Sequence, residues 1–407
     1  MNRRVVITGM GIVTSLGSGV PATAAALRQG QPKIKKLASF DVSAHKTFYG
    51  GEVEDPVLDV AAASGVDTRR WDRASKLLYA ASSQALKNAG VIASQEDPLR
   101  TAFVSGTTLG GMRASQAVHR SILTEADFTP RLGLMGDALA CHQLAHVAGA
   151  LNIVGETLIL NNACASGLSA IGLAYERLRM GPEDMVIAGG YEVMSDFTHA
   201  GFNILQLVTS DACRPFDKGR TGLVLGEGAG VLVLETLENA QARKAPVLAE
   251  IIGYGQASDA YHLTRPDPAA GGASRAIRMA IEEAGILPEM IDYVNAHGTG
   301  TPSNDLMEAK ALGIALGRHA SKVPVSSTKP FMGHLLGASG AVETIISAIA
   351  IQEQMAPANL NLRDLDPECA LNVITGEVRA LKVNVVLSNS FGFGGSNAAI
   401  LLKRFGG

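Results

Sequence analysis

Hydrophobic residues follow two spacings along this chain, and the two spacings alternate. Unbroken apolar runs of about four to eight residues are typical of buried strands, whereas apolar residues three or four positions apart are typical of amphipathic helices. In the first half the order is strand, helix, strand, a strand running into a helix, and a final pair of strands: residues 5–11, 77–90, 101–107, 158–179, 185–190 and 230–235. This alternation predicts an α/β fold with mostly parallel, buried sheets.

The second half repeats the same blocks in the same order. They are residues 249–255, 274–285, 292–299, 323–354, 383–388 and 398–403. Each half is expected to open with a strand that leads to a glycine-rich turn, and its first helix ends at a glycine, Gly90 or Gly285, as C-caps often do. Such self-similarity predicts a duplicated fold in which two halves, residues 1–245 and 246–407, sandwich helices between them.

Three segments of the first half have no counterpart in the second half. They are residues 31–76, 109–150 and 191–229. Insertions in a repeat usually form loops on one face, often the binding face, so we expect a substrate tunnel and an oligomer interface there. No Pro- or Ser-rich linker separates the halves, which predicts one rigid unit.

The composition is that of a globular protein of the cytoplasm. Hydrophobic residues make up 47% of the 407 residues, and the net charge of −3 gives no electrostatic footprint for nucleic acid or a membrane surface. The four cysteines lie far apart without a C-x-x-C pair, which argues against a zinc site and a disulfide framework. The chain enters a strand directly after its first residues, and no apolar run reaches the roughly 18 residues of a membrane span.

Cys164 lies at the corner between an apolar strand and a helix. A thiol at a helix N-terminus faces unpaired backbone N–H groups and the positive end of the macrodipole, which favours its thiolate and supplies donors to an adjacent oxyanion. The alternative is that Cys164 is a small buried hydrophobic residue, as most free cysteines are. The stretch from 158 to 173 alone leaves both interpretations open.

Three further polar motifs follow predicted strands, at residues 295–302, 327–334 and 389–397. Ligands of α/β sheets collect at strand ends. A single histidine after a strand is more often a loop residue, but His297, Lys329, His334 and Cys164 at corresponding strand ends of two related halves are hard to explain as packing.

With these motifs the chain closely resembles the β-ketoacyl-acyl carrier protein synthases of the synthase II type, elongating condensing enzymes of the thiolase superfamily. The similarity runs from Arg4 to Asn397 and is carried by four motifs: 163–167, 297–299, 329–334 and 392–395. It implies a thiolase-like fold, with two duplicated halves forming a layered α-β-α-β-α sandwich. It also implies an acyltransferase that performs a decarboxylative Claisen condensation during fatty acid elongation.

The resemblance assigns roles to individual residues. Cys164 is the acyl-accepting nucleophile, and His297 and His334 form the histidine pair. Lys329 orders the site with Glu308. The backbone N–H groups of Cys164 and Phe393 stabilise an oxyanion, and the side chain of Phe393 gates the acyl pocket. The pantetheine arm is contacted by Thr299 and Thr301, and their loop is braced by Asp305. The acyl tunnel is lined by Leu109, Phe202 and Leu205. The carrier protein is docked by Arg69, Arg70 and Arg131. The three arginines are equally consistent with a solvated basic face.

The chemistry of the reaction supports the histidine assignment independently. Decarboxylation of a malonyl thioester leaves an enolate, and removal of one donor to such an oxyanion typically slows a reaction about 10²- to 10³-fold. His297 and His334 must both be neutral to donate, and a nearby Lys329 disfavours their protonation.

The resemblance implies no metal or redox cofactor, because the substrates are carried on the phosphopantetheine of acyl carrier protein. It further implies a dimer, either a homodimer or a heterodimer with a chain-length-factor-like subunit. Asn161-Asn162 and residues 131–147 depart from the fatty-acid enzymes, so a type II polyketide or polyene ketosynthase with such a partner is an alternative. A non-catalytic chain-length factor is disfavoured by Cys164, and a degradative thiolase by the lack of cysteine in residues 389–397.

The glycine-rich turns are not cofactor loops in this interpretation. The turn at 391–395 lacks the Lys-Ser/Thr of a phosphate-binding loop, and Gly9-Met10-Gly11 has Thr14 in place of the third glycine of a dinucleotide motif. Acyl chain length, saturation and the cognate carrier protein are not encoded in any motif that we identify.

Overall fold

The computed structural model describes residues 3–55, 65–68, 71–97, 100–124 and 134–406. Strands of both halves join in one large mixed sheet, in the order β14-β12-β11-β16-β17-β10-β1-β9-β7-β5-β6. The first-half strands are β1 (Val5–Thr14), β9 (Gly228–Thr236), β7 (Met185–Glu192), β5 (Thr101–Gly106) and β6 (Glu156–Leu160). The second-half strands are β10 (Ala249–Ser258), β17 (Ser396–Lys403), β16 (Val385–Gly392), β11 (Tyr293–Asn295), β12 (Pro324–Ser326) and β14 (Asn372–Val373).

The sheet is less parallel than the sequence pattern predicts. β5 pairs in parallel with β6 and β7, and β11 pairs in parallel with β12 and β16. In each half, however, one strand runs against the others: β9 lies between β7 and β1, and β17 lies between β16 and β10. These are the strands predicted as the second member of each closing pair: β17 returns after a turn at residues 393–395, whereas β9 returns after the long segment 193–227.

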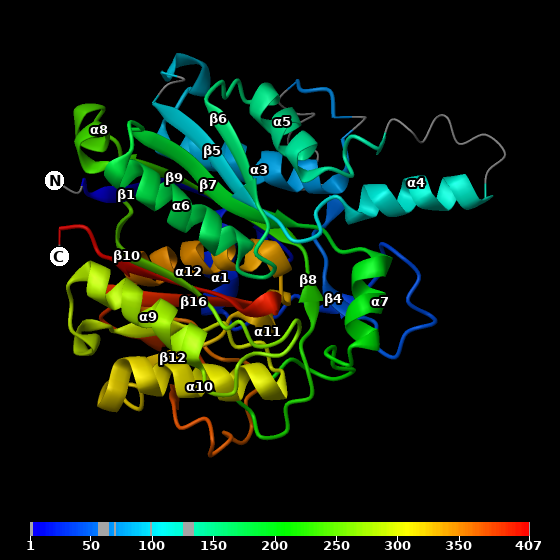
Figure 1. Ribbon diagram of the computed structural model, residues 1–407, viewed down its shortest axis with the longest axis vertical. Helices are drawn as coiled ribbons and strands as arrows, with labels where there is room; N and C mark the ends of the chain where they lie inside the picture. The colour runs from blue at the N-terminus through cyan, green and yellow to red at the C-terminus, as the bar shows by residue number, and fades with distance from the viewer. Residues whose placement is uncertain (1–2, 56–64, 69–70, 98–99, 125–133, 407) are drawn as a thin grey trace.

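Helices cover both faces of the strands in layers, as Figure 1 shows. α3 (Arg73–Ala89) and α5 (Ala140–Ala150) lie on the outer face of the first half, and α9 (Gly271–Ala284) and α10 (Pro302–Leu316) on that of the second. α6 (Ser166–Met180) and α12 (Ser339–Glu353) pack against each other between the two halves, in the largest apolar core. The predicted α-β-α-β-α layering is therefore confirmed.

The repeat extends to details of backbone geometry. β1 has a register shift between Ile7 and Gly9, and β10 has the matching shift between Ile251 and Gly253. The caps agree as well, because α3 ends at Gly90 and α9 at Gly285, both left-handed as predicted. The division of the chain at residue 245 stays a prediction.

The glycines near the start of each half do not form turns, which corrects the sequence expectation. β1 and β10 run on through them, and these positions lie where the outer helix approaches most closely. A Cβ on Gly11 would lie 1.9 Å from the carbonyl oxygen of Ala81 on α3, and one on Gly255 would lie 2.1 Å from that of Ala276 on α9. The glycines therefore let each outer helix pack directly on backbone, which explains them without a dinucleotide.

Shorter elements complete the chain. The helices are α1 (Val20–Arg28), α4 (Met112–Thr124), α7 (Asp196–Ile204), α8 (Leu237–Ala242) and α11 (Lys329–Met332). The strands are β2 (Gly17–Ser18), β3 (Lys35–Lys36), β4 (Tyr49–Gly51), β8 (Leu225–Gly226), β13 (Met355–Ala356) and β15 (Arg379–Ala380), and single turns of 3₁₀ helix occur at 93–95, 288–290, 317–319, 336–338 and 393–395. α4 and α7, both from predicted insertions, pack together, and α4 projects from the body in Figure 1. No helix within the described ranges is long and apolar enough to cross a membrane.

Candidate active site

Cys164 is held in a tight corner between β6 and α6. Ala163 has a positive φ of 50°, which is rare for a residue with a side chain. The Ser166 hydroxyl supports this conformation by donating to the Ala163 carbonyl at 2.6 Å and accepting the Asn162 N–H at 2.8 Å. The Ser390 hydroxyl on β16 donates to the Cys164 carbonyl at 3.1 Å, so both halves fix the position of the cysteine.

Burial makes the Cys164 thiol a weak acid, contrary to the expectation from its helix end. The side chain is 5% exposed, and burial raises its pKa to about 12. Lys329 and the backbone N–H groups of Phe393 and Cys164 lower the pKa but do not outweigh burial. The free protein therefore holds a thiol, and the two N–H groups face the sulfur as the oxyanion assignment requires.

His297 lies directly after β11, on a loop whose backbone N–H groups donate to two buried carboxylates. Glu308 accepts the backbone N–H groups of His297 and Gly298 at 2.8 and 2.7 Å. Asp305 accepts those of Thr299 and Gly300 at 3.1 and 3.2 Å. Asp305 therefore braces this loop, as its predicted role demands.

Lys329 determines which nitrogen of His297 carries the proton. Its buried ammonium contacts three groups: Nδ1 of His297 at 3.3 Å, the His297 carbonyl, and the Glu343 carboxylate at 2.6 Å. An ammonium can only donate, so Nδ1 of His297 accepts and Nε2 bears the hydrogen. Of the two residues predicted to order the site together, Lys329 forms an ion pair with Glu343, and Glu308 holds the loop of His297 through backbone N–H groups.

His334 faces His297 across the same space. The two rings are 5.3 Å apart between centroids and almost perpendicular, and Nδ1 of His334 lies 2.9 Å from the Ser339 hydroxyl. Burial, and secondarily Lys329, holds the pKa of each histidine well below its ordinary value. Both imidazoles are therefore neutral near pH 7, as expected.

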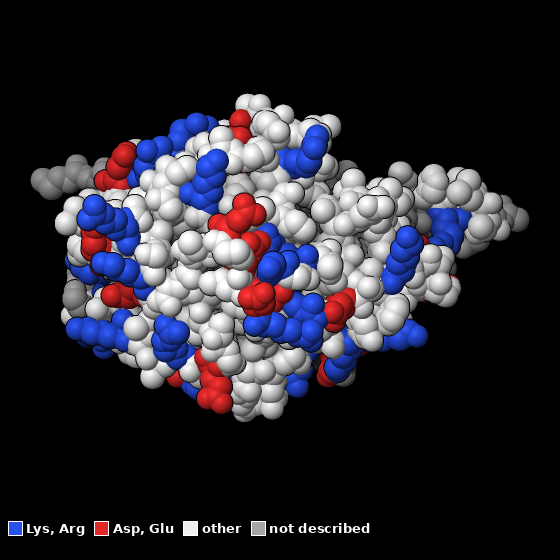
Figure 2. All heavy atoms as spheres, turned by 90° about the horizontal axis from the view of Figure 1, so that it is seen from below, with Lys and Arg blue, Asp and Glu red and all other residues white. Residues whose placement is uncertain are grey.

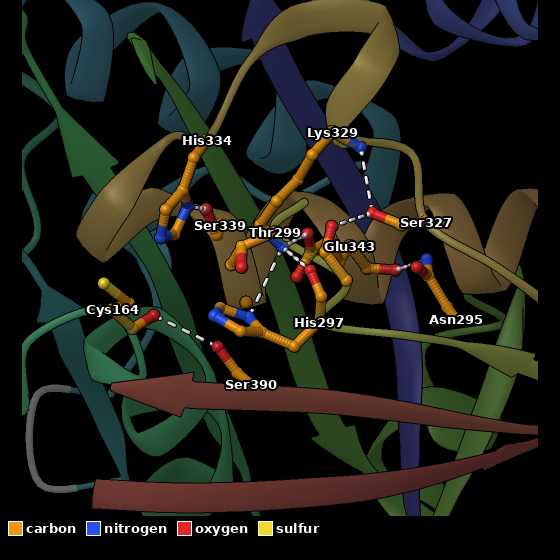
Figure 3. A network of polar contacts seen from close by, with 12 residues as sticks. Cys164, Asn295, His297, Thr299, Ser327, Lys329, His334, Ser339, Glu343 and Ser390 are labelled. Atoms are coloured by element: carbon orange, nitrogen blue, oxygen red, sulfur yellow. Dashed lines mark hydrogen bonds and ion pairs between the residues drawn. The ribbon is translucent and has the colours of Figure 1, made fainter. Parts of the chain in front are cut away.

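Cys164, His297 and His334 line one cavity, and Figure 3 shows their side chains directed toward a common space. Phe393 and Phe202 also line it, with their rings stacked at 5.7 Å. The cavity is lined further out by Thr299 and Thr301, whose hydroxyls lie 2.8 Å apart.

Two of the predicted tunnel residues, Leu109 and Leu205, do not line this cavity. Leu109 is half-buried beside a separate hollow with Asn161, and Leu205 is 45% exposed at the end of α7. Of the three predicted tunnel residues, therefore, Phe202 alone lines the cavity in the described part of the chain. The docking residues Arg69, Arg70 and Arg131 lie outside the described residues.

Sequence reasoning missed four polar residues that support the site: Glu343, Ser339, Ser390 and Glu192. Glu192, at the end of β7, is fully buried and accepts the backbone N–H groups of Thr108, Leu109 and Gly337 at 2.9 to 3.1 Å. It thus ties the loop after β5 to the segment that follows His334. A carboxylate inside an otherwise apolar strand or helix, as at Glu192 and Glu343, was the available signal.

The described side chains include no group of three His, Cys, Asp or Glu residues arranged to hold a metal ion.

Comparison with known proteins identifies the relatives of this arrangement. Residues 2–240 match the β-ketoacyl synthase N-terminal domain, and residues 248–363 match the corresponding C-terminal domain. A 3-oxoacyl-[acyl-carrier-protein] synthase 2 from Coxiella burnetii is 38% identical over 99% of both chains.

Two solved structures share the fold over almost the whole chain. The ishigamide ketosynthase/chain length factor is 32% identical with a TM-score of 0.92 and covers 100% of both chains. A ketosynthase solved in complex with a type II polyketide acyl-carrier protein is 26% identical with a TM-score of 0.89, covering 99% of this chain and 100% of that one. The family resemblance and the thiolase-like fold are confirmed, and the chain belongs to the β-ketoacyl synthase family.

Proposed function

We propose that this ketosynthase elongates acyl chains by decarboxylative Claisen condensation of a malonyl group with an acyl group on Cys164. Both groups arrive on the phosphopantetheine arm of acyl carrier protein. One observation carries the proposal: a thiol and two neutral imidazoles, supplied by opposite halves of the molecule, line a single cavity.

In the first step Cys164 accepts the acyl group. Its sulfur attacks the thioester carbonyl, the carbon–sulfur bond to pantetheine breaks, and the thiol proton ends on the departing pantetheine sulfur. The backbone N–H groups of Cys164 and Phe393 stabilise the oxygen that becomes negative. Because the free thiol has a pKa of about 12, the proton leaves in concert with the attack of the sulfur rather than before it.

In the second step the histidine pair stabilises an enolate. The ammonium of Lys329 leaves the Nε2–H of His297 free for the cavity, and we assign the Ser339 hydroxyl as the donor to Nδ1 of His334, which gives His334 the same tautomer. Two such donors on the malonyl thioester oxygen lower the barrier to loss of carbon dioxide. The resulting carbanion attacks the acyl group, and the Cys164 sulfur leaves.

Intact-protein mass spectrometry tests the first step. Exposure to acyl-acyl carrier protein should add one acyl group per chain, and Cys164→Ala should abolish the adduct. An adduct that persists in this variant contradicts the assignment.

Carbon dioxide release tests the second step separately. Cys164→Gln should still decarboxylate malonyl-carrier protein, because the histidine pair remains intact. A folded Cys164→Gln variant that releases no carbon dioxide contradicts the enolate role of the pair.

The pathway is a second question. The identity to the Coxiella synthase favours fatty acid elongation, whereas the structural likeness to the ishigamide ketosynthase/chain length factor supports the polyketide or polyene alternative. A competition assay with acyl carriers that differ in length and unsaturation separates the two: preference for saturated chains supports the first, and preference for polyenoyl or polyketidyl chains the second.

The partners follow from the same proposal. We infer that the protein works in the cytoplasm as a dimer, either with a second copy or with a chain-length-factor-like subunit. On the face shown in Figure 2, Lys and Arg side chains alternate with Asp and Glu rather than forming a single positive field. Recognition of an acidic carrier on that face therefore requires individual cations at defined positions.

A further inference from the structure

A guanidinium without a partner lies at the mouth of the catalytic cavity. Arg265 lines the cavity together with Cys164 and the two histidines. Its side chain is exposed and makes no hydrogen bond or ion pair with any residue in the described ranges. Its charge is therefore available to a ligand that enters the cavity.

The solvent exposure of the lining residues distinguishes a buried end of the cavity from an open end. The groups at the catalytic end are buried, with Cys164 5% and His334 2% exposed. Thr301 is 8% exposed, and Arg265 and Ser303 are exposed. A molecule whose reactive end lies at Cys164 therefore passes the threonine hydroxyls and leaves the cavity at Arg265.

The loop that bears Arg265 is attached to the turn that bears Phe393. The Gly394 N–H donates to the Leu263 carbonyl at 2.7 Å, and the Asp259 N–H donates to the Gly395 carbonyl at 2.9 Å. Within the loop, the Asp267 N–H donates to the Asp259 carboxylate at 3.1 Å. These bonds fix the backbone of Arg265 relative to the catalytic end of the cavity.

A surface groove continues outward from the same place. It shares Arg265, Pro266 and Ser303 with the catalytic cavity and includes Lys310, whose ammonium donates to the Pro268 carbonyl at 2.9 Å. Arg265 and Lys310 thus border the point at which an elongated substrate leaves the protein, with Asp259 and Glu368 also among the lining residues; of these charged groups, Arg265 is the one shared by the cavity and the groove.

We propose that Arg265 binds the phosphate of the phosphopantetheine arm that delivers acyl and malonyl groups to Cys164, an inference that rests on the proposed function. The thioester is at one end of this arm and its only anionic group is at the other, which matches the order of sulfur, threonines and guanidinium along the cavity. An arginine fork suits a phosphate because it can donate two parallel hydrogen bonds.

The experiment compares one acyl group on pantetheine with the same acyl group on 4′-phosphopantetheine. The second-order rate of acyl adduct formation on Cys164 is measured by intact-protein mass. The wild type should prefer the phosphorylated thioester about fivefold, the size of effect expected for an exposed ion pair. Arg265→Ala should remove this preference, and Arg265→Lys should retain part of it.

Arg278→Ala is the matched control, because Arg278 is an exposed arginine on α9 that does not line the cavity. It should keep the full preference. The wild-type preference should shrink with added salt, since screening weakens exposed charge pairs. An unchanged preference in Arg265→Ala overturns the proposal.

Failure of the proposed function is distinguishable from failure of this inference. If neither thioester acylates wild-type Cys164, the function fails, and calorimetric titration with 4′-phosphopantetheine still tests Arg265. Binding about fivefold weaker in Arg265→Ala supports the phosphate contact, and equal binding overturns it. A loss that occurs with acyl-coenzyme A but not with acyl-carrier protein also overturns the proposal, because the carrier arm is the source it names.

Discussion

The two halves of the molecule build the same strand, corner and helix but place different chemistry at the corner. Between β6 and α6 the corner is short, and Cys164 lies among small residues held by hydroxyls. Between β12 and α12 it is long enough to contain α11 and a further turn, and it carries Lys329 and His334. The first corner therefore exposes a nucleophile to the cavity, whereas the second provides a buried polar network that sets proton positions.

This difference teaches that the duplicated scaffold determines where groups meet but not what they do. The reactivity of Cys164 depends on the backbone conformation of its corner and on nearby N–H groups, so it is sensitive to substitutions that change the local backbone. The donor side depends on charge balance between Lys329 and Glu343, so it tolerates few changes of charge. Substitutions on either side separate these two kinds of dependence.

The largest effect is expected from Lys329→Met. This change leaves the Glu343 carboxylate buried without its partner and removes the donor that fixes the His297 tautomer. Unfolding free energy should fall by about 3–5 kcal/mol, as for other broken buried pairs. Decarboxylation in the Cys164→Gln background should fall by about 10²-fold.

The matched double variant Lys329→Met/Glu343→Met distinguishes the two losses. Chemical denaturation should show most of the stability restored, because no unpaired charge remains, while carbon dioxide release stays low. Recovery of both properties together would contradict the tautomer argument.

The next largest effect is expected from His297→Ala and His334→Ala. Each removes one enolate donor, so decarboxylation should slow about 10²- to 10³-fold. Acyl transfer to Cys164 should slow far less, since its oxyanion is held by backbone N–H groups. Rapid-quench measurement of both steps checks this, and equal losses in the two steps would remove the proposed division of labour between the halves.

In mild acid the same two histidines should lower the stability of the protein, against the opposite contribution of buried carboxyls such as Glu308 and Glu343, whose pKa burial raises to about 7. The unfolded chain takes up protons as pH falls below about 6.5, whereas the folded histidines, whose pKa values are held well below that, do not. Each histidine therefore removes up to about 1.4 kcal/mol of unfolding free energy per pH unit below 6.5. Denaturation at a series of pH values should show that His297→Gln/His334→Gln loses less stability than the wild type between pH 6.5 and pH 5, or gains more.

Alkylation of Cys164 should reveal the weak acidity of its thiol. Because burial raises its pKa to about 12, the rate with iodoacetamide should still increase between pH 8 and pH 10. In urea the same cysteine should level off near its ordinary pKa of about 8.5. A plateau near pH 7 in the folded protein would mean that the helix end, rather than burial, dominates.

The smallest effect is expected from Ala163→Gly. A glycine relieves the positive φ at this corner but gives the unfolded chain more freedom, and each effect is about 1 kcal/mol. The free energy of unfolding should therefore change by no more than about 1 kcal/mol. Mass-detected acylation should slow only if the corner loosens, which makes this variant a sensitive check on the rigidity of the nucleophile.

The sequence was sufficient to predict the layered fold and the meeting of Cys164 with both histidines, because strand ends of a duplicated sheet converge. It was not sufficient for the partner of Lys329. Glu308 and Glu343 are both buried acids on helices that follow the catalytic loops, and only the packing of α12 decides which carboxylate reaches the ammonium.

The acidity of Cys164 and the identity of the tunnel residues depend on tertiary structure in the same way. A helix N-terminus lowers a thiol pKa when solvent reaches it, but the burial of Cys164 is set by residues distant in sequence from both halves, such as Phe202 and Leu336. Leu109 and Leu205 were predicted beside the acyl chain from family position, but Leu109 lines a different hollow and Leu205 is 45% exposed.

The close packing of the outer helices on the glycines of β1 and β10 has a consequence for engineering. Each strand has two glycines two positions apart, and each glycine lies against the backbone carbonyl of an alanine on the outer helix. On α3 the alanines that contact Gly9 and Gly11 are Ala85 and Ala81, and on α9 those that contact Gly253 and Gly255 are Ala280 and Ala276. Because the glycines and alanines have the same spacing in both halves, α3 and α9 are candidates for exchange within one polypeptide. A chimera carrying two copies of one outer helix would ask how far the ancestral symmetry of the duplication still survives.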